Sequence, residues 1–216
     1  MGRAISIDQL YKTKRNVLPF NDKWRDFMGS PECKGSIIIW GASGNGKTRF
    51  AVMLADYLST FKKVAYNSIE EGDSATLARA FQECGITSDN KNITVLNMES
   101  LSDLRERLSK HKSPDVVIVD SLQHWRISEI EYKELITEFD NKLFIFISHA
   151  DGKEPSKAIG MAVKYDANVK IYIDRFVATA TSRCDGCKGK PFVIWEEQAR
   201  VLYGMSFSGM FENESL

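Results

Sequence analysis

The sequence predicts an α/β fold with a mostly parallel central sheet, helices on both faces of that sheet, and antiparallel hairpin strands towards the C-terminal end. Continuous apolar runs, which are typical of strands buried on both faces, alternate with segments whose apolar residues recur at helical spacing. After residue 167, short strand-like runs are separated by turns, which indicates hairpins added to the sheet edge. A length of 216 residues suits one domain with a large core.

Five buried core strands are expected from the apolar runs. They cover about residues 36–40, 62–71, 92–98, 115–122 and 142–150. Helical spacing follows four of them, in the sets Phe50, Met53, Leu54, Tyr57 and Leu58; Leu77, Ala78, Phe81 and Cys84; Leu101, Leu104 and Leu108; and Tyr132, Leu135, Ile136 and Phe139. Because a helix follows each of these strands, the core strands are expected to run parallel.

The chain divides into three segments. Residues 1–34 lack a strong period, and their aromatic and basic residues are expected to pack on the domain or on a neighbouring subunit. Residues 35–200 form the main domain, in which a polar, glycine-containing stretch at 151–166 precedes strand-like runs at 168–176, 177–183 and 191–197. Residues 201–216 are expected to form a C-terminal tail, frayed over the final "FENESL".

The charge balance gives no support for nucleic-acid binding over the whole surface. Lys plus Arg and Asp plus Glu number 29 each, so any basic site must be local. No apolar stretch approaches the roughly 20 residues needed to span a bilayer, and the first ten residues lack the apolar region of a signal peptide. A cytoplasmic location without membrane contact is therefore expected.

Two of the four cysteines, Cys184 and Cys187, form a C-x-x-C pair. The surrounding "RCDGCKGKP" has the composition of a turn between two strands, which favours a simple hairpin. A zinc site usually needs four nearby Cys or His ligands, and no second half-site is visible in the sequence. Metal and redox roles for the pair stay open as the less favoured interpretations.

The segment "GASGNGKT" at residues 41–48 matches the phosphate-binding pattern G-x-x-x-x-G-K-[ST]. The backbone N–H groups of such a loop, and the start of the helix behind it, surround the phosphates of a nucleotide. A glycine turn with a chance lysine would lack the strand before it and the amphipathic helix after it. ATP and Mg²⁺ are the expected ligands, and the expected nucleotide-binding residues are Gly41, Ala42, Ser43, Gly44, Asn45, Gly46, Lys47, Thr48 and Arg49.

Three carboxylates follow predicted strands on the edge from which this loop emerges. Asp120 ends the run "VVIVD" and is expected to bind Mg²⁺ together with Thr48, although buried strands also end in aspartates that are merely solvated. Glu70 and Glu71 end the second strand, where either could activate the attacking water. The alternative is an acidic turn that stabilises the start of the next helix.

The ordered set "GASGNGKT", "SIEEG", "VVIVDSL" and "FIFISHA" resembles the RecA-like P-loop ATPases, the group that contains RecA, RadA, KaiC and the DnaB-type helicases. The resemblance spans about residues 35–197. It implies a RecA-like ATPase core in which Glu70 or Glu71 activates water and His149 senses the γ-phosphate. It also implies that Arg183, in "VATATSR", reaches the nucleotide of a neighbouring subunit, although Thr181 stands where DnaB-type helicases carry a lysine. An exposed hairpin charge is the alternative for Arg183.

The same resemblance implies a homo-oligomer, either a hexameric ring or a filament, with two loops that touch single-stranded DNA. The residues expected to make these contacts are Trp125, Arg126, Lys153, Lys157 and Lys164. The predicted function is DNA-stimulated ATP hydrolysis in recombination, repair or replication. The leading alternative is an assembly or regulatory ATPase acting on a protein partner, such as a helicase loader or a KaiC-like switch, and a small-molecule kinase is a third, weaker interpretation.

Overall fold

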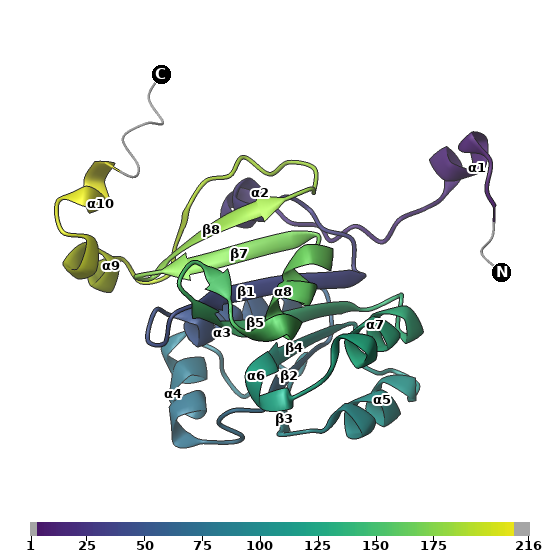
Figure 1. Cartoon of the computed structure of the whole chain (residues 1–216), viewed down its shortest axis with the longest axis horizontal. Coiled ribbons are helices and arrows are strands. Elements are labelled where there is room, and N and C mark those ends of the chain that lie inside the picture. The colour runs from purple at the N-terminus through teal and green to yellow at the C-terminus, as the bar shows by residue number, and fades with distance from the viewer. Residues whose placement is uncertain (1–3, 210–216) are drawn as a thin grey trace.

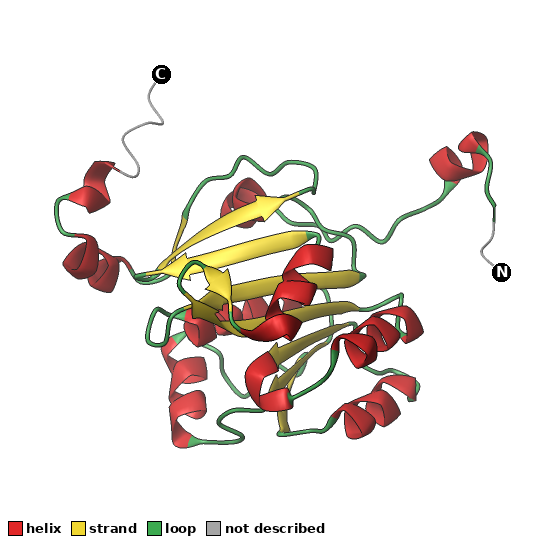
Figure 2. Ribbon diagram, viewed as in Figure 1, coloured by secondary structure: helices red, strands yellow, loops and turns green. Residues whose placement is uncertain are grey.

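The computed structural model describes residues 4–209 and is built around a nine-stranded sheet (Figures 1 and 2). Its strand order is β3-β2-β4-β5-β1-β7-β8-β9, and β6 pairs with β5 outside this path. The strands are β1 (Gly35–Gly41), β2 (Val64–Ser68), β3 (Ile93–Asn97), β4 (Val116–Asp120), β5 (Leu143–Asp151), β6 (Glu154–Pro155), β7 (Val169–Asp174), β8 (Val177–Ser182) and β9 (Phe192–Val193). The five expected core strands, β1 to β5, are parallel to their neighbours in the sheet.

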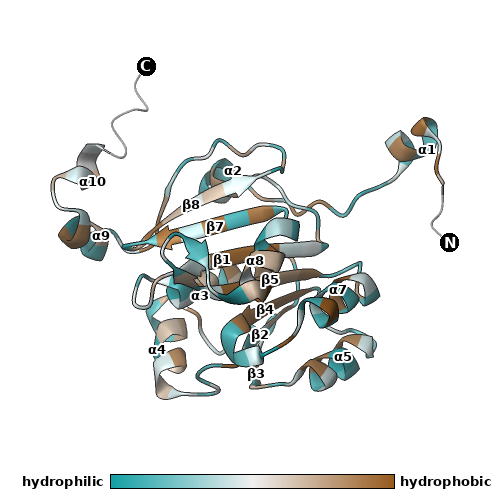
Figure 3. Cartoon of the chain, in the orientation of Figure 1, coloured by the Kyte–Doolittle hydropathy of each residue, from teal (hydrophilic) through white to brown (hydrophobic). Residues whose placement is uncertain are grey.

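Helices cover both faces of the sheet, as predicted. They are α1 (Ile7–Lys12), α2 (Asp22–Met28), α3 (Lys47–Ser59), α4 (Ala75–Glu83), α5 (Leu101–Ser109), α6 (Leu122–Trp125), α7 (Glu129–Glu138), α8 (Lys157–Asp166), α9 (Glu196–Tyr203) and α10 (Ser206–Gly209). One apolar cluster joins α2, α3 and α4 to the first face, and a second cluster joins α5, α6, α7 and α8 to the other. Figure 3 shows the central strands in brown, which marks the apolar layer that the helices enclose.

The C-terminal strands form hairpins, with one difference from the expectation. β8 is antiparallel to β7 and β9 is antiparallel to β8, but β7 itself runs parallel to β1. The polar stretch before them is also more ordered than expected, because it forms β6 and the helix α8. Gly160 and Val163 are the buried residues of α8, too few to produce a clear helical pattern in the sequence.

Most of the N-terminal segment belongs to the core of the same chain. Val17 pairs with Glu32 in a β-bridge, and the Trp24 ring of α2 lies 4.5 Å from the ring of Phe192 and stacks 5.2 Å from that of Tyr57. By contrast, α1 has no buried residue and lies apart from the sheet at the end of an extended connection (Figure 1). Contact between α1 and a neighbouring subunit stays a prediction.

The expected boundary at residue 200 differs from the structure, because α9 crosses it. The short helix α10 follows, and its Phe207 is buried against Val177 and Ala199. Residues up to 209 thus pack on the domain, while the predicted frayed end "FENESL" lies outside the described residues. Among residues 4–209, no helix is long and apolar enough to cross a membrane.

Trp24→Ala tests whether the N-terminal segment is part of the folding unit. Trp24 is 5% exposed, so its removal should lower the free energy of unfolding by about 3 to 5 kcal/mol, through lost burial and the cavity left behind. The measurement is urea denaturation followed by circular dichroism. Tyr11→Ala, at an aromatic residue of α1 that is 79% exposed, is the control and should change stability by less than about 0.5 kcal/mol. Equal effects of the two changes would contradict the assignment.

Candidate functional site

The register of the parallel strands brings most of the predicted site residues to one edge of the sheet. Ser68, which precedes the Glu70 turn, pairs with Asp120, and Gly41 at the start of the phosphate loop pairs with His149. A cavity of about 290 Å³ opens there. The predicted residues that line it are Ser43, Gly44, Gly46, Lys47, Thr48, Arg49, Glu70, Glu71, Asp120 and His149.

The phosphate loop needs glycine at two positions for different reasons. Gly46 caps α3 with a φ of 97°, and a Cβ atom there would lie 2.7 Å from Cδ1 of Phe176. At Gly41 a Cβ atom would lie 2.2 Å from the carbonyl oxygen of Ile173. The loop is therefore pressed against the β7–β8 turn. Asn45 also fastens it there, because its carbonyl accepts the N–H of Phe176 at 3.2 Å.

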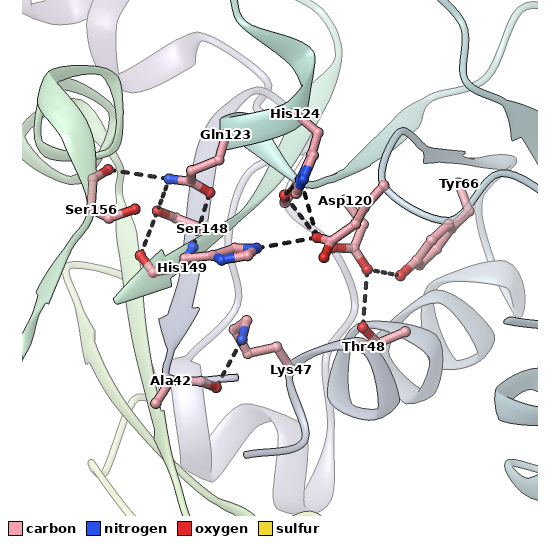
Figure 4. Close-up of polar contacts among 12 residues, drawn as sticks. Ala42, Lys47, Thr48, Tyr66, Asp120, Gln123, His124, Ser148, His149 and Ser156 are labelled. Atoms are coloured by element: carbon pink, nitrogen blue, oxygen red, sulfur yellow. Dashed lines mark hydrogen bonds and ion pairs between the residues drawn. The ribbon is translucent and has the colours of Figure 1, made fainter. Parts of the chain in front are cut away.

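Lys47, the first residue of α3, points back across the phosphate loop. Its Nζ donates to the carbonyl oxygen of Ala42 at 2.9 Å (Figure 4). Burial lowers the pKa of Lys47, and the nearby carboxylates of Asp120 and Glu70 oppose this effect. An ammonium held by one carbonyl next to two carboxylates is available for a phosphate that enters the cavity.

Asp120 joins the phosphate loop to the sheet. Its Oδ2 accepts hydrogen bonds from Thr48 Oγ1 at 3.1 Å and from the hydroxyl of Tyr66 at 2.8 Å. Burial raises the pKa of Asp120, and these two hydrogen bonds lower it in part. A hydroxyl and a carboxylate in contact at the end of a buried strand form an oxygen donor set that fits Mg²⁺. Tyr66 was not identified from the sequence, where it is one apolar position of a buried strand.

Glu70 and Glu71 have different surroundings. Oε2 of Glu70 lies 3.1 Å from His149 Nε2, 3.3 Å from His124 Nδ1 and 3.1 Å from Ser121 Oγ. Burial raises the pKa of Glu70, but the hydrogen bond and charge of His149, with smaller contributions from His124 and Ser121, hold it below its ordinary value. Glu71 instead accepts a hydrogen bond from Ser74 Oγ, the N-cap of α4, at 3.0 Å. Glu70 is therefore the carboxylate directed towards the strand-end histidine.

Gln123 connects three segments around the site, as Figure 4 shows. Its Oε1 accepts the N–H of His149 at 3.0 Å, and its Nε2 donates to Ser148 Oγ at 2.8 Å and to the carbonyl of Ser156 at 3.1 Å. The side chain is part of the short helix α6 and is 9% exposed. Its neighbours are distant in the sequence, so no local pattern could have identified it.

The predicted DNA-stacking face of Trp125 is wrong. The residue is 8% exposed, its ring lies 6.5 Å from that of Phe146, and its Nε1 donates to the carbonyl of Glu99 at 3.1 Å. Lys164 also differs from the free cation expected, because it forms an ion pair with Glu154 and lies 4.9 Å from the Trp40 ring centroid. Arg126, Lys153 and Lys157 are exposed, as a surface contact requires.

Arg183 does not join the cavity of its own chain. It follows the end of β8, where Ser182 pairs with Val169 at the start of β7. Because β7 is parallel to β1, this is the sheet edge opposite the phosphate loop. The position leaves action on another subunit's nucleotide as a prediction.

Cys184 and Cys187 lie between the antiparallel strands β8 and β9, which confirms the hairpin interpretation. Both thiols are free. Among the described residues, Glu70, His124 and His149 form the group of three or more side chains that could hold a metal ion, so the cysteines are not part of such a group.

Comparisons with known proteins agree with this geometry. No family model matches the chain. The DNA repair protein RadA of Aquifex aeolicus is 33% identical over 97 residues, a match that covers 44% of this chain and 21% of that protein. Two solved structures are similar in fold. One, an ATPase domain of the DnaB-like type, has a TM-score of 0.54 at 17% identity, covering 77% of this chain and 83% of that domain. The flagellar accessory protein FlaH of Methanocaldococcus jannaschii has a TM-score of 0.59 at 14% identity, covering 82% and 91%.

The predicted resemblance to the RecA-like P-loop ATPases is confirmed, and the fold is of that type. The segment matched in RadA is about a fifth of that protein. The comparisons do not identify the substrate on which this chain acts.

Proposed function

We propose that the chain hydrolyses ATP with Mg²⁺ and uses the cycle to act on DNA. The observation that carries the proposal is the cavity in which the phosphate loop, the Thr48–Asp120 pair and Glu70 meet. Phosphate binding, magnesium binding and water activation each need one of these parts, and all three lie at the same edge of the sheet.

The residues for nucleotide binding follow from the geometry. Lys47 exchanges the carbonyl of Ala42 for the β- and γ-phosphates, while the N–H groups of the loop and of α3 surround them. Thr48 and Asp120 hold Mg²⁺, which supplies positive charge to the phosphate oxygens when it is bound. Tyr66 keeps the carboxylate of Asp120 oriented towards Thr48.

Glu70 is the proposed general base. Its lowered pKa keeps it ionised near neutral pH, so that it can accept a proton from the attacking water. His149 contacts both the base and, through its N–H, Gln123, which suits a residue that responds to the γ-phosphate. Glu71 is assigned to the start of α4 and not to the chemistry.

The likeness to a protein named for DNA repair and the exposed cations after β4 and β5 support action on DNA. Arg126, Lys153 and Lys157 are the proposed phosphate contacts. The side chain of Gln123 links the segments that carry them to His149, so binding at the surface can alter the site. An assembly or regulatory ATPase acting on a protein partner is the alternative, and the burial of Trp125 favours it by removing the proposed stacking face.

Glu70→Gln should bind ATP but lower its turnover by about 10²-fold or more, because the amide cannot accept the proton. Glu71→Gln is the matched control and should stay near the parent rate, since this neighbouring carboxylate faces Ser74. The measurements are single-turnover hydrolysis and fluorescent nucleotide binding. A larger loss in Glu71→Gln than in Glu70→Gln would overturn the assignment of the base.

Single-stranded DNA should bind and accelerate hydrolysis. Each lysine that neutralises a phosphate contributes about 0.7 to the slope of log affinity against log salt, so Lys153→Gln with Lys157→Gln should flatten that slope by about 1.4. Lys63→Gln with Lys112→Gln is the control: it removes the same charge at the amino ends of β2 and β4, and Lys112 shares the positive φ of Lys157. Anisotropy with a labelled oligonucleotide measures both pairs. Hydrolysis indifferent to DNA, without binding at low salt, would favour the protein partner.

Arg183 is proposed to act on a neighbouring subunit within a ring or filament. Arg183→Ala should therefore bind ATP but hydrolyse it on the order of 10³-fold more slowly. Mixing it with Lys47→Ala should restore part of the turnover, because the second subunit supplies Arg183 to an intact phosphate loop. Mixing Glu70→Gln with Lys47→Ala is the control and should restore none, since both defects lie in the same chain's cavity. Absence of rescue in oligomers that demonstrably form would make Arg183 an ordinary surface charge.

A further inference from the structure

We propose that Glu70, His124 and His149 form a binding site for a transition-metal ion of the Zn²⁺ type, distinct from the Mg²⁺ position at Thr48 and Asp120. The three ligand atoms lie within 4.8 Å of one another. They come from three segments, the turn after β2, the helix α6 and the end of β5, so the sheet register brings them together. The two rings face each other with centroids 5.7 Å apart.

The spacing of the polar atoms matches a small coordination sphere. From Glu70 Oε2, the distances are 3.1 Å to His149 Nε2 and 3.3 Å to His124 Nδ1. Ser121 Oγ adds a fourth atom, 3.1 Å from Glu70 Oε2 and 3.0 Å from His124 Nδ1. Two ligands of a tetrahedral Zn²⁺, bound at 2.0–2.1 Å, are separated by about 3.3 to 3.4 Å. Small side-chain shifts would therefore admit the ion.

Hydrogen bonds alone satisfy this cluster poorly. Three atoms that can donate, one each from Ser121, His124 and His149, converge on the same carboxylate oxygen, which has two lone pairs. A cation between them takes a lone pair from the carboxylate and from each imidazole. The three side chains are 38%, 46% and 35% exposed for Glu70, His124 and His149, so an ion can enter from solvent.

The ligand types separate this site from the magnesium position. Imidazole nitrogen favours Zn²⁺, Co²⁺, Ni²⁺ and Cu²⁺, whereas Mg²⁺ requires oxygen ligands such as Thr48 and Asp120. Coordination also uses the Glu70 lone pair that would accept the proton of the attacking water. Metal binding at this site and ATP hydrolysis are therefore mutually exclusive, a consequence that rests on the proposed role of Glu70.

The test is a Co²⁺ titration of the nucleotide-free chain, followed by visible absorption, with Zn²⁺ binding measured by calorimetry. Cys184→Ser and Cys187→Ser are introduced throughout to remove competing thiols. We expect one ion per chain and the absorption bands of cobalt with nitrogen and oxygen ligands. His124→Gln should lower the affinity by at least about tenfold, because even partners outside the ligand set change it by 10- to 100-fold. His111→Gln is the matched control: it alters the remaining histidine, which lies before β4, and should leave binding unchanged.

No Co²⁺ binding, or equal affinity in His124→Gln and the parent chain, would overturn the site. These arms contain no nucleotide, so their outcome does not depend on ATPase activity. The second arm measures Mg²⁺-ATP turnover in the parent chain and in His111→Gln. Saturating Zn²⁺ should suppress turnover in both, and unchanged turnover in a chain shown to hold the ion would overturn the exclusion of hydrolysis by the metal.

Discussion

The buried carboxyl group and carbonyl of Asp120 are the point on which the site depends. The carboxylate accepts hydrogen bonds from Thr48 in α3 and from Tyr66 in β2, which ties the phosphate loop to the sheet. The carbonyl oxygen of the same residue accepts the N–H groups of Ile69 and Glu70, at 2.7 and 3.0 Å. One residue thereby positions the magnesium ligands and the proposed base. A buried carboxylate is costly unless it is paired, and here its hydrogen bonds offset that cost.

A second set of contacts holds the phosphate loop from the C-terminal side. Phe176, in the β7–β8 turn, packs against Gly46 and lies 5.7 Å from Trp195 between ring centroids. Arg49, one residue after the loop, lies 4.7 Å from the Trp195 ring centroid. Asp174 adds a bond from Asn45 and another from Tyr203 of α9. The late segments of the chain therefore support the loop, which explains why the domain extends through α9.

The helix α6 links chemistry to surface. Within four residues it carries Gln123, which holds the backbone of His149, and His124, which contacts Glu70. Trp125 anchors the same helix in the core. A ligand that moves α6 or the neighbouring Ser156 segment would shift both the strand-end histidine and the base. The arrangement gives a physical route by which a partner on this face could control hydrolysis, whichever macromolecule that partner is.

The sequence by itself determined the α/β class, the parallel core strands and the phosphate loop, because these depend on local period, buried runs and glycines at fixed spacing. It also located Asp120 and the carboxylate pair at strand ends. Only the tertiary structure separated Glu70 from Glu71, brought Tyr66, Gln123 and His124 to the site, and buried Trp125. These outcomes depend on strand order and register, which pair residues such as Ser68 with Asp120 across 52 positions of sequence. Local patterns carry no information on such pairs, since contact between distant strands is decided when the whole core packs.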